Sequence, residues 1–336
     1  MLSIGFPVLL AGIKKGELER YVLSGTAQGT TYTVTYYAND KLVHRAEIDS
    51  VLAVIDSSMS LYKPYSLINK INAGGRGKYP IDEHFFRVFT KSLAIHKDSK
   101  GIFDITIAPL TNLWGFGTTE IEFFPDSIQV DKALACVGMD KLRLKGRLLE
   151  KKEPCVQLDM NGVAQGYSVD VLADYLEGKG ITHYVVELGG ELRVKGPKPD
   201  GTPVRIGIER PTSGDSGPLA INDVVEITEG AITTAGSYRN YMRDGNRKVS
   251  HHISPTTGYP FNTEIISATI YAKDAVTADG YDNVIMAMNA DEAITFVNRR
   301  HGMEVFVLYI DESGNVRDTM SMGFSNMITS KTNNLN

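Results

Sequence analysis

The chain has 336 residues, of which 42% are hydrophobic and 22% charged, and it carries 32 glycines. This composition is typical of a soluble globular protein with many tight turns and excludes a disordered or fibrous chain. The net charge of −5 and the absence of a long basic run argue against nucleic-acid binding.

The two cysteines are too few for a disulfide framework or a cysteine-rich metal site, and they do not fix the redox compartment. They are Cys136 and Cys155.

The first 12 residues form an apolar run that is too short to cross a bilayer as a helix of about 20 residues. The run resembles a signal remnant, although it lacks a basic start. Ile13 stands where the lipidated cysteine of a bacterial lipoprotein would be. We interpret residues 1–22 as a signal-like remnant or a flexible terminus.

Alternating residues over 20–38 predict two strands around a Gly-Thr turn. Apolar spacing predicts helices over 46–60 and 82–98, with a loop at 62–80 between them. The segment 156–160 alternates as a strand and runs directly into a helical pattern.

The second half of the chain predicts five more strands and one strong helix, 274–289, between the last two of them. No internal repeat or linker interrupts the chain, so we predict one compact mixed α/β domain over 23–330 and a disordered tail at 331–336. The expected strands cover 183–188, 203–209, 223–228, 266–272 and 304–310.

The helix at 274–289 carries an oxygen-rich face, because Asp279, Asp282 and Asn283 stand at i, i+3 and i+4. Two carboxylates and an amide oxygen are hard ligands that suit Mg²⁺. The alternative is a solvated polar face. Repulsion between the neighbouring carboxylates favours a cation.

Asp159 and Gly162 stand at the predicted strand-to-helix junction. Asp159 is either a helix cap or a residue that faces a ligand. Gly162, which lacks a Cβ, would let its carbonyl approach a metal or phosphate. Gly189 and Gly190 follow a strand and indicate either a bulge or a close approach to a ligand.

Residues 233–261 concentrate hydroxyl groups with Arg239, His251 and His252, as a binding loop would. The hydroxyls and the arginine would donate to a phosphate, and one histidine would act as a base. The alternative is a structural or solvated histidine pair.

The segment 101–117 holds Trp114, the only tryptophan, near Phe103, Asp104 and Phe116. These aromatics either form core or wall a flat ring such as a flavin. The common nucleotide motifs, including the P-loop and the dinucleotide-binding glycine pattern, are absent from the sequence.

In their order along the chain, these segments resemble the ApbE family of FAD:protein FMN transferases. The resemblance covers nearly the whole chain and implies a T-fold-like α+β domain that binds FAD and Mg²⁺. It rests on eight collinear blocks: AQGTTY, MSLYKPYSLINKIN, GIFDITIAPLTNLWGFG, LDMNGVAQGYSVD, VVELGGELRVKG, TTAGSYRNY, SHHISPTTGYP and TADGYDN.

The resemblance implies that the protein cleaves the FAD pyrophosphate, joins FMN through a phosphoester to a Ser or Thr hydroxyl of an acceptor protein, and releases AMP. His251 is the candidate base, and Asp279 is a second candidate catalytic residue. The implied contacts to FAD are Gln28, Tyr62, Ile102, Phe103, Asp104, Asp159, Gln165 and Ile253. The implied Mg²⁺ ligands are the Gly162 carbonyl, Asp279, Asp282 and Asn283.

Three positions depart from the family pattern, which commonly has Thr at Asn283, Asp at Ser254 and Met at Gln28. Asn283 still offers an oxygen, and Gln28 would repack the flavin edge. Ser254 removes a carboxylate that we expect near the phosphates.

Two other functions remain open from the sequence: hydrolysis of FAD to FMN and AMP with Mg²⁺, and FAD binding without catalysis. By analogy with the family, the acceptor would be a subunit of a membrane redox complex. The enzyme would then work on the periplasmic side of the bacterial cytoplasmic membrane.

Overall fold

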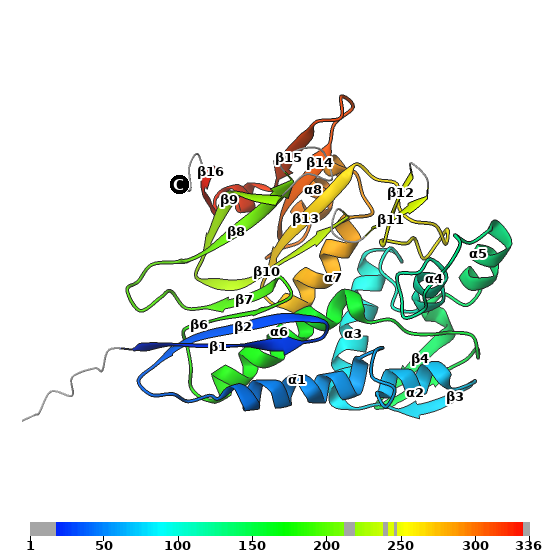
Figure 1. Ribbon diagram of the computed structural model, residues 1–336, viewed down its shortest axis with the longest axis horizontal. Helices are drawn as coiled ribbons and strands as arrows, with labels where there is room; N and C mark the ends of the chain where they lie inside the picture. Colours follow the sequence, from blue (N-terminus) through cyan, green and yellow to red (C-terminus); the bar gives the residue numbers. More distant parts are fainter. Residues whose placement is uncertain (1–17, 212–218, 238–240, 245–246, 332–336) are drawn as a thin grey trace, which may run out of the picture.

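The centre of the molecule is an eight-stranded sheet, seen in a computed structural model that describes residues 18–211, 219–237, 241–244 and 247–331 (Figure 1). Each adjacent pair of its strands is antiparallel. In spatial order the strands are β1 (Glu19–Ala27), β2 (Thr30–Ala38), β6 (Tyr184–Leu188), β7 (Glu191–Lys195), β10 (Glu229–Gly236), β13 (Ile265–Ala272), β14 (Glu304–Ile310) and β15 (Val316–Met320).

Helices cover one face of this sheet (Figure 1). Phe89, Val163 and Ile285 from three of the helices share one buried cluster with Ile270 of β13. This apolar contact is what holds the helical layer on the sheet. The helices are α1 (Arg45–Met59), α3 (Glu83–Asp98), α6 (Asn161–Gly178), α7 (Ala275–Ile285) and α8 (Ala290–Asn298).

A smaller sheet covers the other face and makes a third layer. Its strands are, in spatial order, β16 (Ile328–Lys331), β9 (Leu219–Ile227) and β8 (Val204–Pro211), and the short helix α9 (Met322–Ser325) precedes β16 in the chain. Ile208, Val225 and Phe324 pack there against Val194 and Phe306 of the central sheet. The central strands are therefore buried on both faces, as the near-continuous apolar run of β13 requires.

The remaining short elements lie at one end of the molecule, on the right in Figure 1. The elements at this end are α2 (Leu67–Ala73), β3 (Gly77–Pro80), α4 (Ala108–Leu113), α5 (Ser127–Leu134), the 3-10 turn Met139–Lys141, β4 (Leu142–Lys145), β5 (Leu148–Lys151), β11 (Tyr241–Asp244) and β12 (Arg247–Ser250).

Among the described residues, no helix is both long and apolar enough to cross a membrane.

The helices begin at polar residues that accept hydrogen bonds from their first turns. Asp82 accepts from the Phe85 amide at 2.9 Å. Asp274 accepts from the Thr277 amide at 2.9 Å in the same way. Because the first amides of a helix have no partner within it, these side chains stabilise α3 and α7 at the positions where they begin.

The α+β fold class is confirmed, as are the helices predicted at 46–60 and 82–98 and the later strands. The helix expected at 274–289 ends at Ile285, and α8 begins five residues later. The loop expected at 62–80 is wrong, because α2 and β3 form within it. The strand expected at 156–160 is reduced to a single bridge between Gln157 and Ile107.

The expected start of the domain at residue 23 is four residues too late. β1 begins at Glu19, and residues 19–22 pair with β2. Residues 1–17 and 332–336, which contain most of the predicted terminal segments, lie outside the described residues.

A disulfide joins Cys136, just after α5, to Cys155, on the segment that leads to α6. The two cysteines stand 19 residues apart.

Since the disulfide restricts the unfolded chain, we expect its reduction to lower the free energy of unfolding by about 3 kcal/mol. Urea unfolding with and without a reductant measures this change. Cys136→Ser should unfold alike under both conditions, and a wild-type midpoint unchanged after complete reduction would contradict the expectation.

Candidate functional site

A cavity of about 600 Å³ lies where α1, α6, α7 and the short elements meet. Its size is within the range of sites for small organic ligands. The segments that surround it are far apart in the sequence but were each singled out by sequence analysis. All eight residues expected to contact FAD line it, namely Gln28, Tyr62, Ile102, Phe103, Asp104, Asp159, Gln165 and Ile253.

Gln28 occupies the tight turn between β1 and β2, where its φ of 51° and that of Gly29, 76°, are both positive. Such a turn matches the twist of an antiparallel hairpin. The Gln28 amide donates to the Ser168 hydroxyl of α6 at 2.8 Å. Its own oxygen, Oε1, is buried and has no partner among the described residues. An acceptor atom left this way at a cavity wall fits a ligand that donates a hydrogen bond.

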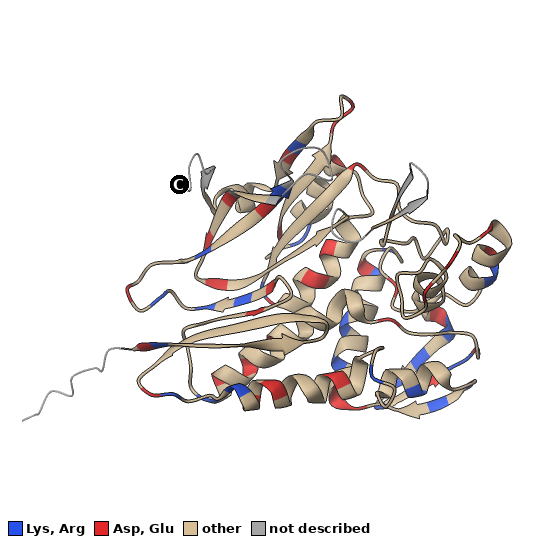
Figure 2. Ribbon diagram, viewed as in Figure 1, with Lys and Arg blue, Asp and Glu red and all other residues tan. Residues whose placement is uncertain are grey.

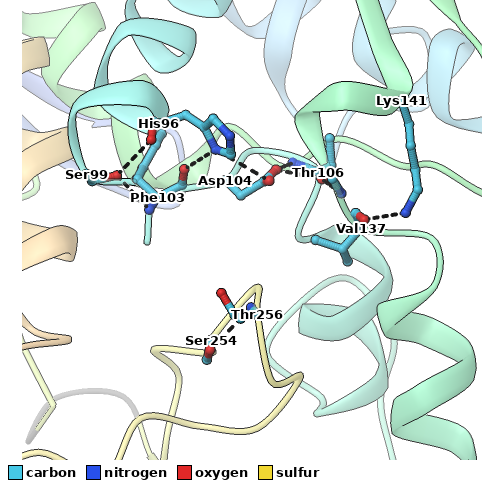
Figure 3. Close-up of polar contacts among 10 residues, drawn as sticks. His96, Ser99, Phe103, Asp104, Thr106, Val137, Lys141, Ser254 and Thr256 are labelled. Atoms are coloured by element: carbon cyan, nitrogen blue, oxygen red, sulfur yellow. Dashed lines mark hydrogen bonds and ion pairs between the residues drawn. The ribbon is translucent and has the colours of Figure 1, made fainter. Parts of the chain in front are cut away.

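The end of α3 holds the segment that carries Phe103 and Asp104 (Figure 3). The His96 ring lies 2.9 Å from the Phe103 carbonyl, and the Ser99 hydroxyl accepts from the Phe103 amide at 3.2 Å. Asp104 accepts from both the amide and the hydroxyl of Thr106, at 2.8 and 2.6 Å. These bonds fix the conformation of an irregular segment of the cavity wall.

Asp159 is buried, and its carboxylate accepts from the Asn161 amide at 2.9 Å and from the Thr111 hydroxyl at 3.2 Å. Burial raises the pKa of this carboxyl. The residue therefore closes the first turn of α6 and lines the cavity at the same time.

The peptide before Asp159 is clamped by a side chain 86 residues away. The Asn72 amide donates to the Leu158 carbonyl at 2.8 Å, and its oxygen accepts from the Leu158 amide at 2.7 Å. Lys151, which is buried, supports this region by donating to the Ile71 and Gly74 carbonyls at the end of α2. These contacts set the position of Asp159 in the absence of a regular strand.

The start of α6 lies beside α7. The Asn283 side-chain nitrogen is 3.3 Å from the Gly162 carbonyl oxygen, 2.9 Å from the Asp279 carbonyl oxygen and 3.0 Å from Oδ1 of Asp282. A Cβ on Gly162 would approach this nitrogen to 3.3 Å. Three oxygen atoms, one from the start of α6 and two from α7, thus surround the side-chain NH2 group of Asn283, which carries a positive partial charge.

Asp279 and Asp282 lie behind the cavity wall and do not line it. They are 5% and 2% exposed, so the solvated polar face considered for this helix is wrong. Asp279 accepts from the Gly166 amide at 2.8 Å, and Asp282 accepts from the Thr233 hydroxyl at 2.8 Å. Burial raises the pKa of Asp279 to about 7, and burial with the charge of Asp279 raises the pKa of Asp282 well above its usual range.

Asp170 of α6 joins the two helices. Its carboxylate accepts from the Ala275 and Val276 amides of α7 at 2.9 and 2.8 Å, and Arg193 of β7 donates to it at 2.5 Å. One turn earlier, a Cβ on Gly166 would come within 2.4 Å of the Ala275 carbonyl oxygen. The close approach of α6 and α7 therefore depends on a glycine and a buried ion pair.

His251 and His252 both line the cavity, with ring centroids 3.9 Å apart. The His251 ring also lies 6.3 Å from the ring of Phe116, another lining residue. The solvated alternative for this pair is wrong for His252, which is 7% exposed. Arg239 lies outside the described residues.

Ser254 is buried but does not line the cavity. Its hydroxyl accepts from the Thr256 and Thr257 amides at 3.3 and 3.1 Å and closes the turn that follows (Figure 3). Its neighbours Ile253 and Pro255 line the cavity, and the expectation that a carboxylate at this position would lie near the phosphates stays a prediction. The serine performs a local turn-closing task that does not require a charge.

Trp114 belongs to a separate small core, where its ring nitrogen donates to the Gly258 carbonyl at 2.8 Å. It does not line the cavity, whereas Phe103 and Phe116 do. The core alternative is therefore confirmed for Trp114, and the role of Phe103 and Phe116 as walls for a flat ring stays a prediction.

Gly189 and Gly190 form the tight turn between β6 and β7, with φ of 67° and 111°. They make no bulge. A Cβ on Gly189 would come within 3.0 Å of the Gln165 side chain, so this glycine leaves room for a cavity residue.

Asp56, Asp104 and Asp159 line the cavity, while the described part of the lining includes neither Lys nor Arg. α7 carries acidic and no basic residues (Figure 2). Within the described ranges, no group of three or more His, Cys, Asp or Glu side chains is placed to hold a metal. A cation here would therefore depend on carbonyl and amide oxygens as well as carboxylates.

An antiparallel α+β domain, with a polar and aromatic cavity backed by buried carboxylates, is typical of an enzyme that binds a ligand of cofactor size. The model of the ApbE family matches residues 28–307. The chain therefore belongs to the ApbE family.

Curated relatives share about a third of their residues with this chain. The FAD:protein FMN transferase of Vibrio cholerae is 34% identical over 303 residues, which cover 88% of this chain and 89% of the relative. That of Escherichia coli K12 is 32% identical, covering 95% and 92%.

Solved structures agree with this assignment. The flavin transferase ApbE of Vibrio cholerae superposes with a TM-score of 0.84 at 31% identity, covering 92% of this chain and 99% of that one. The flavinyl transferase ApbE of Pseudomonas stutzeri, in its apo form, gives 0.82 at 29% identity, covering 94% and 98%.

Proposed function

We propose that this protein is an FAD:protein FMN transferase that requires Mg²⁺. It takes FAD into the cavity, and the hydroxyl oxygen of an acceptor Ser or Thr attacks the phosphorus on the FMN side. The bond from that phosphorus to the bridging oxygen breaks, AMP leaves, and FMN stays on the acceptor as a phosphoester. The observation that carries this proposal is the convergence of all eight expected FAD contacts on one cavity.

The cavity walls have the chemistry that a flavin dinucleotide needs. Phe103 and Phe116 offer aromatic faces, and Gln28 and Asp159 offer acceptor oxygens for N–H and O–H groups. Thr111 and the end of α3 hold these walls in place before a ligand arrives. Such preorganisation favours binding, because less order has to be created.

The residues at the α6–α7 junction fit Mg²⁺. The Gly162 carbonyl, the carboxylates of Asp279 and Asp282 and the amide oxygen of Asn283 would hold it, all of them hard oxygen donors. The support is the convergence of three oxygens on the Asn283 amide nitrogen, together with two buried carboxylates that form no ion pair with a Lys or Arg of the described ranges. When bound, the ion would offset the charge of the pyrophosphate and of the departing AMP.

His251 is our candidate for the group that takes the proton from the acceptor hydroxyl. It lines the cavity beside Phe116, and an imidazole can accept a proton near neutral pH. A hydroxyl that keeps its proton is a weak nucleophile toward an anionic phosphorus centre, so removal of that proton assists the attack.

The test is incubation of the purified protein with FAD, Mg²⁺ and a candidate Ser/Thr acceptor protein. We expect a fluorescent acceptor band in a denaturing gel, a mass increase equal to FMN less water, and release of AMP. An acceptor with the target hydroxyl removed is the control. Free FMN and AMP without any adduct would show a hydrolase instead, and intact FAD would show a binding protein without catalysis.

We also propose that the protein works in an oxidising compartment on the periplasmic side of a bacterial cytoplasmic membrane, with a subunit of a membrane redox complex as its acceptor. The Cys136–Cys155 disulfide supports the compartment, because such bonds persist mainly outside the reducing cytosol. Fractionation of cells that produce the protein, with a thiol-labelling assay of the cysteines, tests it. Reduced thiols in a cytosolic fraction would contradict the proposal.

A further inference from the structure

His252, a residue of the cavity lining, has a buried polar atom without a hydrogen-bond partner among the described residues. The atom is Nε2 of the ring, and the residue is 7% exposed. Buried polar atoms of native proteins nearly always have partners. A partner brought by the ligand explains this exception.

Ser250 determines which ring nitrogen of His252 carries the proton. The Ser250 hydroxyl oxygen accepts from the His252 backbone amide at 3.3 Å and lies 3.1 Å from Nδ1 of the ring. The Ser250 hydroxyl has one proton, and if it donates this proton to Nδ1 while its oxygen accepts from the amide, both groups are satisfied. Nε2 then carries the ring proton and is a donor that has no partner among the described residues.

The ring remains neutral in this position. Burial, and then the neighbouring His251 ring, hold the pKa of His252 well below its usual range. The His252 backbone is fixed as well, because its carbonyl accepts from the Phe261 amide at 2.9 Å. A fixed, neutral N–H group therefore lies beside the candidate base.

We propose that the N–H at Nε2 of His252 donates a hydrogen bond to a phosphate oxygen of the bound dinucleotide. The inference rests on the proposed function, which places FAD in this cavity. The described lining has no Lys or Arg for this task, and a backbone-anchored N–H donor at an anionic centre contributes without carrying charge itself. Among the two adjacent histidines, His251 then moves a proton and His252 binds an anion.

The experiment compares the affinity for FAD with that for riboflavin, which has the same ring system but no phosphate. Titrations with Mg²⁺ present would use the wild type, His252→Phe and His252→Gln. We expect His252→Phe to weaken FAD binding about tenfold or more, because a hydrogen bond to a charged group is lost. Riboflavin binding should stay within about twofold of the wild type, and His252→Gln, which keeps an N–H, should recover much of the FAD affinity.

A second variant tests the proton assignment. Ser250→Ala should weaken FAD binding several-fold in the wild type but add little in the His252→Phe background, because both act through the same donor. His301→Gln, a change at an exposed histidine, is the control, and thermal unfolding of each variant monitors folding.

Equal loss of FAD and riboflavin affinity, or no loss of either, would overturn the assignment of His252 to the phosphates. Additive effects of the Ser250 and His252 changes would overturn the proposed proton position. If His252→Phe weakens the binding of FAD but not of riboflavin, while the wild type forms no covalent flavin, only the proposed transfer activity is contradicted. The two failures are therefore distinguishable.

Discussion

Replacement of Asp279 with alanine will abolish Mg²⁺-dependent turnover, with a loss in kcat of at least about 100-fold, the scale on which ligands and their supports act at metal sites. Asp279 lies on α7 next to Asp282 and one turn before Asn283, and its carbonyl oxygen is 2.9 Å from the Asn283 amide. Its carboxylate accepts from the Gly166 amide, so the change also removes a link to α6. Initial rates across a Mg²⁺ titration measure the effect.

Asp279→Asn separates charge from shape, because its amide oxygen still accepts from the Gly166 amide. It should fold like the wild type but show a large loss of Mg²⁺ affinity. Asp291→Ala, at an exposed position on α8, is the matched control and should be fully active. Unchanged Mg²⁺ dependence in Asp279→Ala would refute the metal assignment.

The same carboxylate sets a pH dependence. In the protein without a cation, burial holds the pKa of Asp279 at about 7, so below that pH the group is mostly protonated. A cation must displace this proton and also that of Asp282, whose pKa is raised as well, so its apparent affinity falls as the pH drops through about 7 and rises as the pH increases above it. Calorimetric titrations with Mg²⁺ at several pH values measure this trend, together with the protons released.

Asp170→Ala is the change that we expect to destabilise the fold most. It leaves the Ala275 and Val276 amides at the start of α7 without their acceptor, and it leaves Arg193, only partly exposed, without its ion-pair partner. Breaking a buried charge pair on one side costs about 3 to 5 kcal/mol. Urea unfolding, followed by circular dichroism, should show a loss of that size.

The control for this change is Asp174→Ala, an exposed position one turn further along α6. It should unfold within about 0.5 kcal/mol of the wild type. If Asp170→Ala were as stable as Asp174→Ala, the bond between α6 and α7 would not have the importance that we assign to it.

The regular elements were predictable because local spacing determines them. The apolar residues of α3 recur at helical intervals, and β13 and β14 are long enough to be recognised from composition alone. Short elements within polar segments escaped prediction. α2 has only seven residues and depends on Ser66 at its start and on the buried Lys151 at its end.

The candidate site was partly predictable for a similar reason. Asp279, Asp282 and Asn283 share one face of one helix, and Gly162 follows Asp159 closely, so short-range spacing identified both groups. The resemblance to the ApbE family then indicated that these two groups of residues belong to one site.

The supporting residues carry no such local pattern. Asn72 reaches Leu158 over 86 residues, and Asp170 reaches the start of α7 over more than 100. Single polar residues that act at such separations look like ordinary surface positions in a sequence. Sequence position also does not show that Ser254 closes a turn, because a residue between two cavity-lining neighbours need not line the cavity itself.

The most direct test of the metal and FAD assignment is a crystal structure of the protein with FAD and Mn²⁺ in place of Mg²⁺. Anomalous scattering locates Mn²⁺ without reference to any model of the ligands. We expect one strong peak within coordination distance of the Gly162 carbonyl and the side-chain oxygens on α7, next to the FAD pyrophosphate. A cavity that holds FAD while the peak is absent, or lies elsewhere on the molecule, would contradict the account.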